Sequence, residues 1–264
     1  MTSLQAGRYG VLDDVLALVE SSAEASRAFR APGHALAPDV QTWLASPEQG
    51  VKAAIESVHG AETTIDALAG FAPCSLTVIG AVVSEDTCWA EITRRGEGEP
   101  ETCLAGLTYG ATGQVTRLVW LRAPLVAGRE VHGEGAASDR RTPDGRTILE
   151  RYFADLTNSR FGEAAAHFTV DTLYSHPPYA GGTERVLFNG REALWRGFVE
   201  ERGPSPVRQI ITGLWQQGDR AFVEGVIEGI PNGGTLFSTA QITPEGEIAR
   251  YVAFYSATRV PDAR

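Results

Sequence analysis

A histidine followed by two prolines is the feature of this sequence that most directly suggests chemistry. His176 ends an alternating segment at residues 172–176, and Pro177 and Pro178 follow it. An imidazole titrates near neutral pH, so a pocket can hold it as a general base without a large change of its pKa. Prolines cannot donate to a central strand ladder, which predicts that a strand ends at His176. The alternative is a half-buried structural histidine that is hydrogen-bonded to the backbone.

Aromatic residues near His176 could line an apolar pocket. Alternation along a strand places Tyr174 on the same face as His176, and it places Tyr251 and Tyr255 together on the last predicted strand. Tyr152, on a predicted helix, could donate a hydrogen bond to a developing oxyanion, or it could be a core residue with its hydroxyl at an edge. Further candidates for the pocket wall, which could equally be packing residues, are Tyr179, Trp195 and Trp215.

Two glutamates alternate with apolar residues on another predicted strand. Glu224 and Glu228 alternate with Val223 and Ile227, which predicts a solvated outer sheet face for the glutamates. With the opposite orientation of the strand, Glu224 would be an acid in the pocket. The corresponding first-half strand at residues 40–45 offers no acid or base where His176 lies in the second half, so we expect the pocket in the second half.

Composition argues against several classes of function. The chain has 264 residues, a hydrophobic fraction of 43% and a formal net charge of -10, with no run rich in Lys and Arg. A basic surface is the first requirement for binding phosphate backbones, so we expect no nucleic-acid partner. No apolar run approaches the roughly 20 residues of a membrane span, and the opening residues carry no targeting pattern, so we expect a cytoplasmic protein without membrane contact. The three cysteines match no metal motif and no nucleotide-binding loop is present, so we expect neither metal nor cofactor.

A weak internal repeat predicts two domains of similar length. The segment GQVTRLVWLRAPLV (residues 113–126) resembles GEIARYVAFYSATRV (residues 246–260), and two further pairs of upstream segments match in the same order at nearly the same offset. The polar stretch at residues 131–145, rich in Gly, Ser and Asp, has the composition of a linker. We therefore predict one domain at residues 1–135 and a second at residues 136–264.

The second half is predicted to place three helices and a strand before four further strands. Thr142 precedes a proline at the first position of a helix, whose apolar face continues to Leu156; a short helix then carries Ala164, Ala165 and Phe168. A third helix is predicted from Asn189, as its N-cap, to Gly203. The four strands are expected at residues 207–215, 221–230, 235–242 and 247–257.

The first half has a similar but less regular pattern. We predict a long helix at residues 12–29, a strand at residues 39–45, and a helix that Ser46 caps and Gly60 ends, followed by strands after Ser75. Helices that pack on one face of a mainly antiparallel sheet define an α+β fold.

Three motifs of the second half carry a family resemblance. They are ILERYFADLTNSRFGEAAAHFTVDTLYSHPPY, FNGREALWRGF and GEIARYVAFYS. The order and spacing of these motifs resemble those of the nuclear transport factor 2-like superfamily. This superfamily includes SnoaL-like cyclases, ketosteroid isomerase and scytalone dehydratase. The resemblance implies two tandem cone-shaped domains, each a curved, mainly antiparallel sheet packed against about three helices. This fold carries enzymes and non-enzymes alike.

The resemblance to ketosteroid isomerase also implies roles for particular residues. Tyr152 lies where that enzyme has its first oxyanion donor, His176 where it has its general-base aspartate, and Ser238 near its second oxyanion donor. The sequence therefore departs from the isomerase at two of these positions, His176 and Ser238.

These observations lead to an expected function and an alternative. We expect a cofactor-independent enzyme that acts on a hydrophobic small molecule, polyketide- or terpenoid-like, by isomerisation, cyclisation, dehydration or epoxide opening. His176 would be the base, and Tyr152 and Ser238 would stabilise negative charge. The first domain would be a structural partner in an intramolecular pseudo-dimer, or the chain would form a homodimer. The alternative is a non-catalytic small-molecule-binding or assembly protein.

Overall fold

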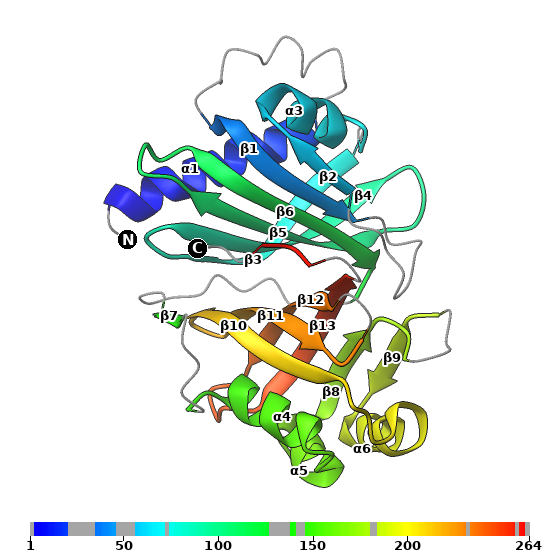
Figure 1. Ribbon diagram of the computed structural model, residues 1–264. Helices are drawn as coiled ribbons and strands as arrows, with labels where there is room; N and C mark the ends of the chain where they lie inside the picture. The colour runs from blue at the N-terminus through cyan, green and yellow to red at the C-terminus, as the bar shows by residue number, and fades with distance from the viewer. Residues whose placement is uncertain are drawn as a thin grey trace. The chain divides into compact units, whose positions relative to one another are not determined.

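The described part of the chain folds into two compact units. The computed structural model describes residues 3–20, 35–45, 56–71, 74–126, 138–140, 146–179, 184–230, 233–256 and 259–261. The described residues up to Val126 belong to the first unit and those from Ser138 onward to the second. Each unit has one sheet with helices on one of its faces (Figure 1), which confirms the α+β fold class. The predicted boundary between residues 135 and 136 lies outside the described ranges.

The first unit contains six described strands and two described helices. The strands follow one another across the sheet in the order β2-β1-β6-β5-β4-β3, and β1 is parallel to β6. The elements are α1 (Ser3–Glu20), β1 (Leu36–Ala45), β2 (Glu56–His59), α3 (Ala61–Ala69), β3 (Cys74–Val83), β4 (Thr87–Gly96), β5 (Glu101–Tyr109) and β6 (Val115–Pro124).

Two predicted helices of the first unit need correction. Helix α1 begins at Ser3, nine residues before the predicted start at residue 12, and the predicted stretch 21–29 lies outside the described residues. The helix predicted from Ser46 to Gly60 is wrong at its end, because residues 56–59 form strand β2, antiparallel to β1. Gly60, with φ of 90°, begins α3 instead of ending a helix. A strand of four residues that depends on pairing with β1 leaves little periodic signal in the sequence.

The second unit has a seven-stranded sheet and its helices on one face. The strand order is β7-β10-β11-β12-β13-β8-β9, and β13 is parallel to β8. The elements are β7 (Ser138–Arg140), α4 (Ile148–Thr157), α5 (Phe161–Ala166), β8 (Phe168–His176), β9 (Val186–Asn189), α6 (Arg191–Arg196), the π-helix η2 (Gly197–Arg202), β10 (Arg208–Gln217), β11 (Arg220–Glu228), β12 (Gly234–Ile242) and β13 (Ile248–Ser256).

The predicted helix starts of the second unit also differ from the structure. Helix α4 begins after Thr147, which forms a capping box with Glu150, so Thr142 is not its N-cap. Helix α6 begins after Gly190, with no side-chain cap, so Asn189 is the last residue of β9 instead of a cap. Gly190 has a φ of 89°, a conformation that glycine adopts without strain, and this allows the sharp change from strand to helix.

The remaining elements of the second unit lie close to their predictions. The four last strands agree with the predicted ranges within two residues at each end, and β8 ends at His176 as the prolines predicted. Phe168 begins β8 and is not part of the second helix. Strands β7 and β9 were not predicted; β7 lies in the stretch that was interpreted as a linker.

The two units share their topology. Six strands of the second sheet follow the order of the first sheet, with β7 added at one edge. The irregularity in the pairing of β3 with β4, between Val78 and Gly80, has its counterpart between Ile211 and Gly213 in β10. Gly60 and Gly190 each begin a helix with nearly the same φ. These correspondences lie at the spacing of the sequence repeat.

The core of the second unit lies between its sheet and its helices. Val223 and Ile227 of β11 and the apolar face of α4 belong to this core, as predicted. Glu224 lies on the opposite face of β11, so it is not an acid in the pocket. The prediction that this face is solvated is nevertheless wrong at Glu224, because its exposed fraction is 1%.

Candidate functional site

A cavity of about 180 Å³ opens beside His176 in the second unit. It lies where β8, β10, β11 and β13 meet the segment after η2. The described residues of its wall are mostly apolar and include a single charged side chain, that of Arg202. The lining residues are His176, Pro178, Tyr179, Arg202, Ser205, Val207, Gln209, Ile227, Ile230, Tyr255 and Ser256.

Hydrogen bonding fixes the tautomer of His176. The imidazole is 4% exposed, and its Nδ1 lies 2.5 Å from the carbonyl oxygen of Pro177. A carbonyl oxygen only accepts hydrogen bonds, so Nδ1 carries the proton. In the neutral ring, Nε2 therefore has a free lone pair, and it has no hydrogen-bond partner within the described residues.

Burial keeps this ring neutral. Desolvation lowers the pKa of His176 to about 3, although its bond to the Pro177 carbonyl opposes that change. The positive charges of Arg185 and Arg202 lower the pKa further. At neutral pH His176 is thus an uncharged group that can accept a proton at Nε2, and the charge that it would gain is disfavoured by its surroundings.

Tyr255 supplies a hydroxyl next to the histidine. The rings of His176 and Tyr255 are 4.5 Å apart, nearly perpendicular at 77°. Gln209 Nε2 donates to the Tyr255 hydroxyl oxygen, which leaves the hydroxyl proton available for another acceptor. Burial raises the pKa of Tyr255 well above its ordinary value of 10.0, so this hydroxyl remains protonated.

Three further tyrosines, Tyr152, Tyr174 and Tyr251, form an aromatic cluster behind the cavity. Tyr174 stacks on His176 with centroids 6.0 Å apart, so the two share one face of β8 as alternation predicted, and it also stacks on Tyr251 of β13 with centroids 5.1 Å apart. The hydroxyls of Tyr152 and Tyr174 are 3.1 Å apart. Tyr152, Tyr174 and Tyr251 are at most 1% exposed and do not line the cavity.

Ser238 lies on β12 within the same buried region. Its side chain is 0% exposed and does not line the cavity either. Burial raises the pKa of Tyr251, and the nearby hydroxyl of Ser238 opposes this change. The structure thus brings Tyr152, Ser238 and His176 into one core, but only His176 of the three reaches the cavity.

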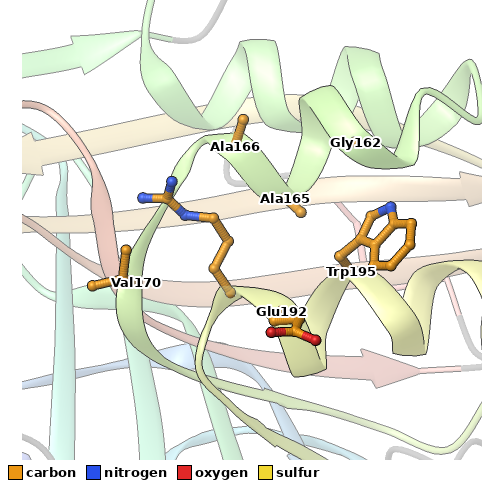
Figure 2. A pocket seen from close by; sticks show the side chains of 7 residues that line it. Gly162, Ala165, Ala166, Val170, Glu192 and Trp195 are labelled. Atoms are coloured by element: carbon orange, nitrogen blue, oxygen red, sulfur yellow. The ribbon is translucent and has the colours of Figure 1, made fainter.

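The two tryptophans that were predicted for the pocket wall, Trp195 and Trp215, lie away from the cavity beside His176. Trp195 on α6 is 44% exposed and lines a separate surface depression with Gly162, Ala165 and Val170 (Figure 2). Trp215 on β10 is buried on the face of the sheet opposite the core, and its ring lies against Gly213. The irregular pairing at Gly213 shifts the register of β10 and β11. Neither indole contributes to the wall beside His176, in contrast to the sequence-based expectation.

Two arginines near the site were not predicted from the sequence. Arg202 is the last residue of η2, and Arg185 directly precedes β9. Neither position follows a motif, because the fold alone brings these segments beside the end of β8. Tyr179, which was predicted, lines the cavity and lies 4.8 Å from His176 between ring centroids.

The described residues contain no group of three or more His, Cys, Asp or Glu side chains placed to hold a metal ion. No helix among them is long and apolar enough to cross a membrane.

Several solved structures are similar to less than half of this chain, which is about the length of one unit. A putative ketosteroid isomerase from Kribbella flavida matches with 21% identity, 44% of this chain and 79% of that chain, and a TM-score of 0.35. A protein with a ketosteroid isomerase-like fold from Catenulispora acidiphila, solved in complex with trimethylamine, matches with 22% identity, 44% and 88% coverage, and a TM-score of 0.35. A putative polyketide cyclase from Sinorhizobium meliloti matches with 20% identity, 43% and 95% coverage, and a TM-score of 0.34. No protein-family model and no curated protein matches the sequence.

The names of these structures, a putative ketosteroid isomerase, a ketosteroid isomerase-like fold and a putative polyketide cyclase, describe those proteins. The likeness concerns the fold, and the chemistry depends on the residues of this chain.

Proposed function

We propose that the second unit is a cofactor-independent enzyme that moves a proton on an apolar small molecule bound beside His176. The observation that carries this proposal is the fixed tautomer of a neutral histidine at the wall of an open, mostly apolar cavity. A base in a water-poor site next to a hydrogen-bond donor is the minimal equipment for general acid–base catalysis.

The roles differ from those that the sequence suggested. His176 Nε2 accepts a proton from a carbon or hydroxyl group of the substrate. The hydroxyl of Tyr255 donates a hydrogen bond to the oxygen on which negative charge develops, a role expected earlier for Tyr152 and Ser238. The Tyr152 hydroxyl is bonded to Tyr174, and neither Tyr152 nor Ser238 lines the cavity. A base and a hydrogen-bond donor such as His176 and Tyr255 can serve isomerisation, cyclisation, dehydration or epoxide opening.

One observation favours the alternative function. The low pKa of His176 in the empty cavity makes Nε2 a weak base, and a weak base is of little use for removing a proton from carbon. In the alternative, the second unit binds a small apolar molecule without converting it. The two functions differ in whether His176 is needed for turnover or only for the shape of the cavity.

Proton exchange tests the enzymatic proposal without knowledge of the natural substrate. Phenylacetone, an apolar ketone with acidic α protons, is incubated with the protein in D₂O, and deuterium uptake is followed by NMR. We expect exchange above the buffer rate with the natural protein and at the buffer rate with His176→Gln. Equal exchange with both proteins would assign the cavity to binding alone.

A further inference from the structure

Arg202 is the one charged residue among the described residues of the cavity wall, and none of these lining residues carries a negative charge. Its Nη1 donates to the carbonyl oxygen of Gly203 at 3.3 Å, and its guanidinium lies 5.8 Å from the ring of Phe161. It forms no ion pair with any carboxylate of the described residues. Among the residues that the structure describes, no acidic side chain lines the cavity.

The other nearby arginine is already bonded. Arg185 donates from Nε to the hydroxyl of Ser175 at 2.7 Å and from Nη2 to the carbonyl of Ala253, and its guanidinium lies over the ring of Phe254. It does not line the cavity. The donors of Arg185 thus hold the ends of β8 and β13 together, whereas Arg202 retains donors for a bound molecule.

An apolar cavity with one uncompensated guanidinium selects for a particular ligand. A guanidinium presents a planar fork of donors that matches a carboxylate, and such charge-assisted hydrogen bonds are about twice as strong as neutral ones. From this geometry we infer that the substrate is a small apolar molecule that carries a carboxylate, bound by Arg202 while its apolar body lies against Ile227, Ile230 and Val207. The inference deepens the proposed function and rests on the same cavity.

A bound carboxylate would also change the basicity of His176. The charged groups that act on the imidazole are Arg185 and Arg202, and both disfavour its protonation. The tyrosines that surround it, Tyr174, Tyr179 and Tyr255, have raised pKa values and are uncharged at neutral pH. An anion on Arg202 therefore offsets one of the two opposing charges and raises the pKa of His176. Binding of the substrate would thus increase the basicity of the histidine that removes its proton.

The test compares two probes of the same shape, phenylacetate and phenylacetamide, by titration calorimetry at pH 7. We expect the natural protein to bind the carboxylate at least about tenfold more tightly than the amide, as one charge-assisted hydrogen bond predicts. Arg202→Gln should remove this preference and keep the affinity for the amide. Arg196→Gln, on the exposed side of the preceding helical turn, is the matched control and should keep the preference.

Other outcomes overturn the inference. Equal affinity for the two probes, binding of neither probe, or an unchanged preference in Arg202→Gln would each exclude Arg202 as a carboxylate site. If thermal unfolding indicates that Arg202→Gln does not fold, Arg202→Met, which keeps the apolar stem, is compared in its place.

A second readout separates this inference from the proposed function. With ¹³C-labelled histidine, the NMR titration of His176 should move to higher pH when phenylacetate is bound, and phenylacetamide should not move it. His176→Gln should keep the carboxylate preference, since binding depends on Arg202. Preference without exchange on phenylacetone or on 4-oxo-4-phenylbutanoate, a ketone that carries a carboxylate, would leave the carboxylate site standing and exclude the enzymatic proposal. Exchange without preference would do the reverse.

Discussion

The rings of His176 and Tyr255 meet at 77° with their centroids 4.5 Å apart, at the ends of neighbouring strands β8 and β13. One ring offers a lone pair and the other a hydroxyl proton. A small molecule in the cavity can therefore contact a base and a hydrogen-bond donor at the same time. This pairing leads to predictions for the residues at the wall and for those behind it.

The first prediction concerns the stability of the fold at acidic pH. His176 has a folded-state pKa of about 3 against an ordinary value of 6.5, so below pH 6.5 the unfolded chain takes up a proton that the folded chain does not. The free energy of unfolding should fall as the pH falls from about 6.5 towards 3, with a loss of about 2–3 kcal/mol from this group at pH 4.5. Urea unfolding of the natural protein and of His176→Gln at pH 7 and 4.5 measures this contribution. A variant whose stability falls as steeply as that of the natural protein would contradict the buried neutral histidine.

The second prediction concerns the buried pair of hydroxyls behind the cavity. Removing either hydroxyl of the Tyr152–Tyr174 pair removes a buried hydrogen bond, so Tyr152→Phe and Tyr174→Phe should each lower the free energy of unfolding by about 1–2 kcal/mol. The double variant should lose less than the sum of the two, because both single changes remove the same hydrogen bond. Additive losses in denaturant unfolding would exclude the hydrogen bond.

The third prediction separates the donor at the wall from the tyrosine in the core. Tyr255→Phe should lower the rate of proton exchange by on the order of 100-fold, because it removes the hydroxyl that stabilises the developing charge. Tyr152→Phe is the matched control and should leave exchange nearly unchanged, since Tyr152 does not line the cavity. The reverse ranking in the D₂O assay would return the donor role to Tyr152, as the sequence resemblance implied.

The fourth prediction concerns the helical segment that carries Arg202. A methyl group at Gly197, the first residue of η2, would lie 2.1 Å from the ring of Phe188. Gly197→Ala should therefore lower the free energy of unfolding by about 1–3 kcal/mol and weaken the carboxylate preference by displacing Arg202. Gly162→Ala on α5 is the matched control: nothing lies within 4 Å of its added methyl group, and the helix should gain up to about 1 kcal/mol. Equal thermal stability of the two variants would show that η2 does not depend on this contact.

The sequence alone determined which side chains share a face. Alternation along β8 and β13 placed Tyr174 with His176 and Tyr251 with Tyr255, and the prolines after His176 ended the strand there. These features are local, since they depend on strand geometry and on the missing amide hydrogen of proline. The α+β class and the last four strands of the second unit followed from patterns of the same kind, whereas β2, β7 and β9 did not.

Only the tertiary structure decided which of these residues reach the cavity and what their chemistry is. It buried Tyr152 and Ser238 behind the wall and turned Trp195 and Trp215 away from it. It also brought Arg202 close to His176 from another part of the chain. Burial and charge arise from neighbours that are distant in sequence, and no local pattern encodes them. The sequence could therefore identify His176 as a candidate base, but its neutral state and the position of Arg202 near it depend on the fold.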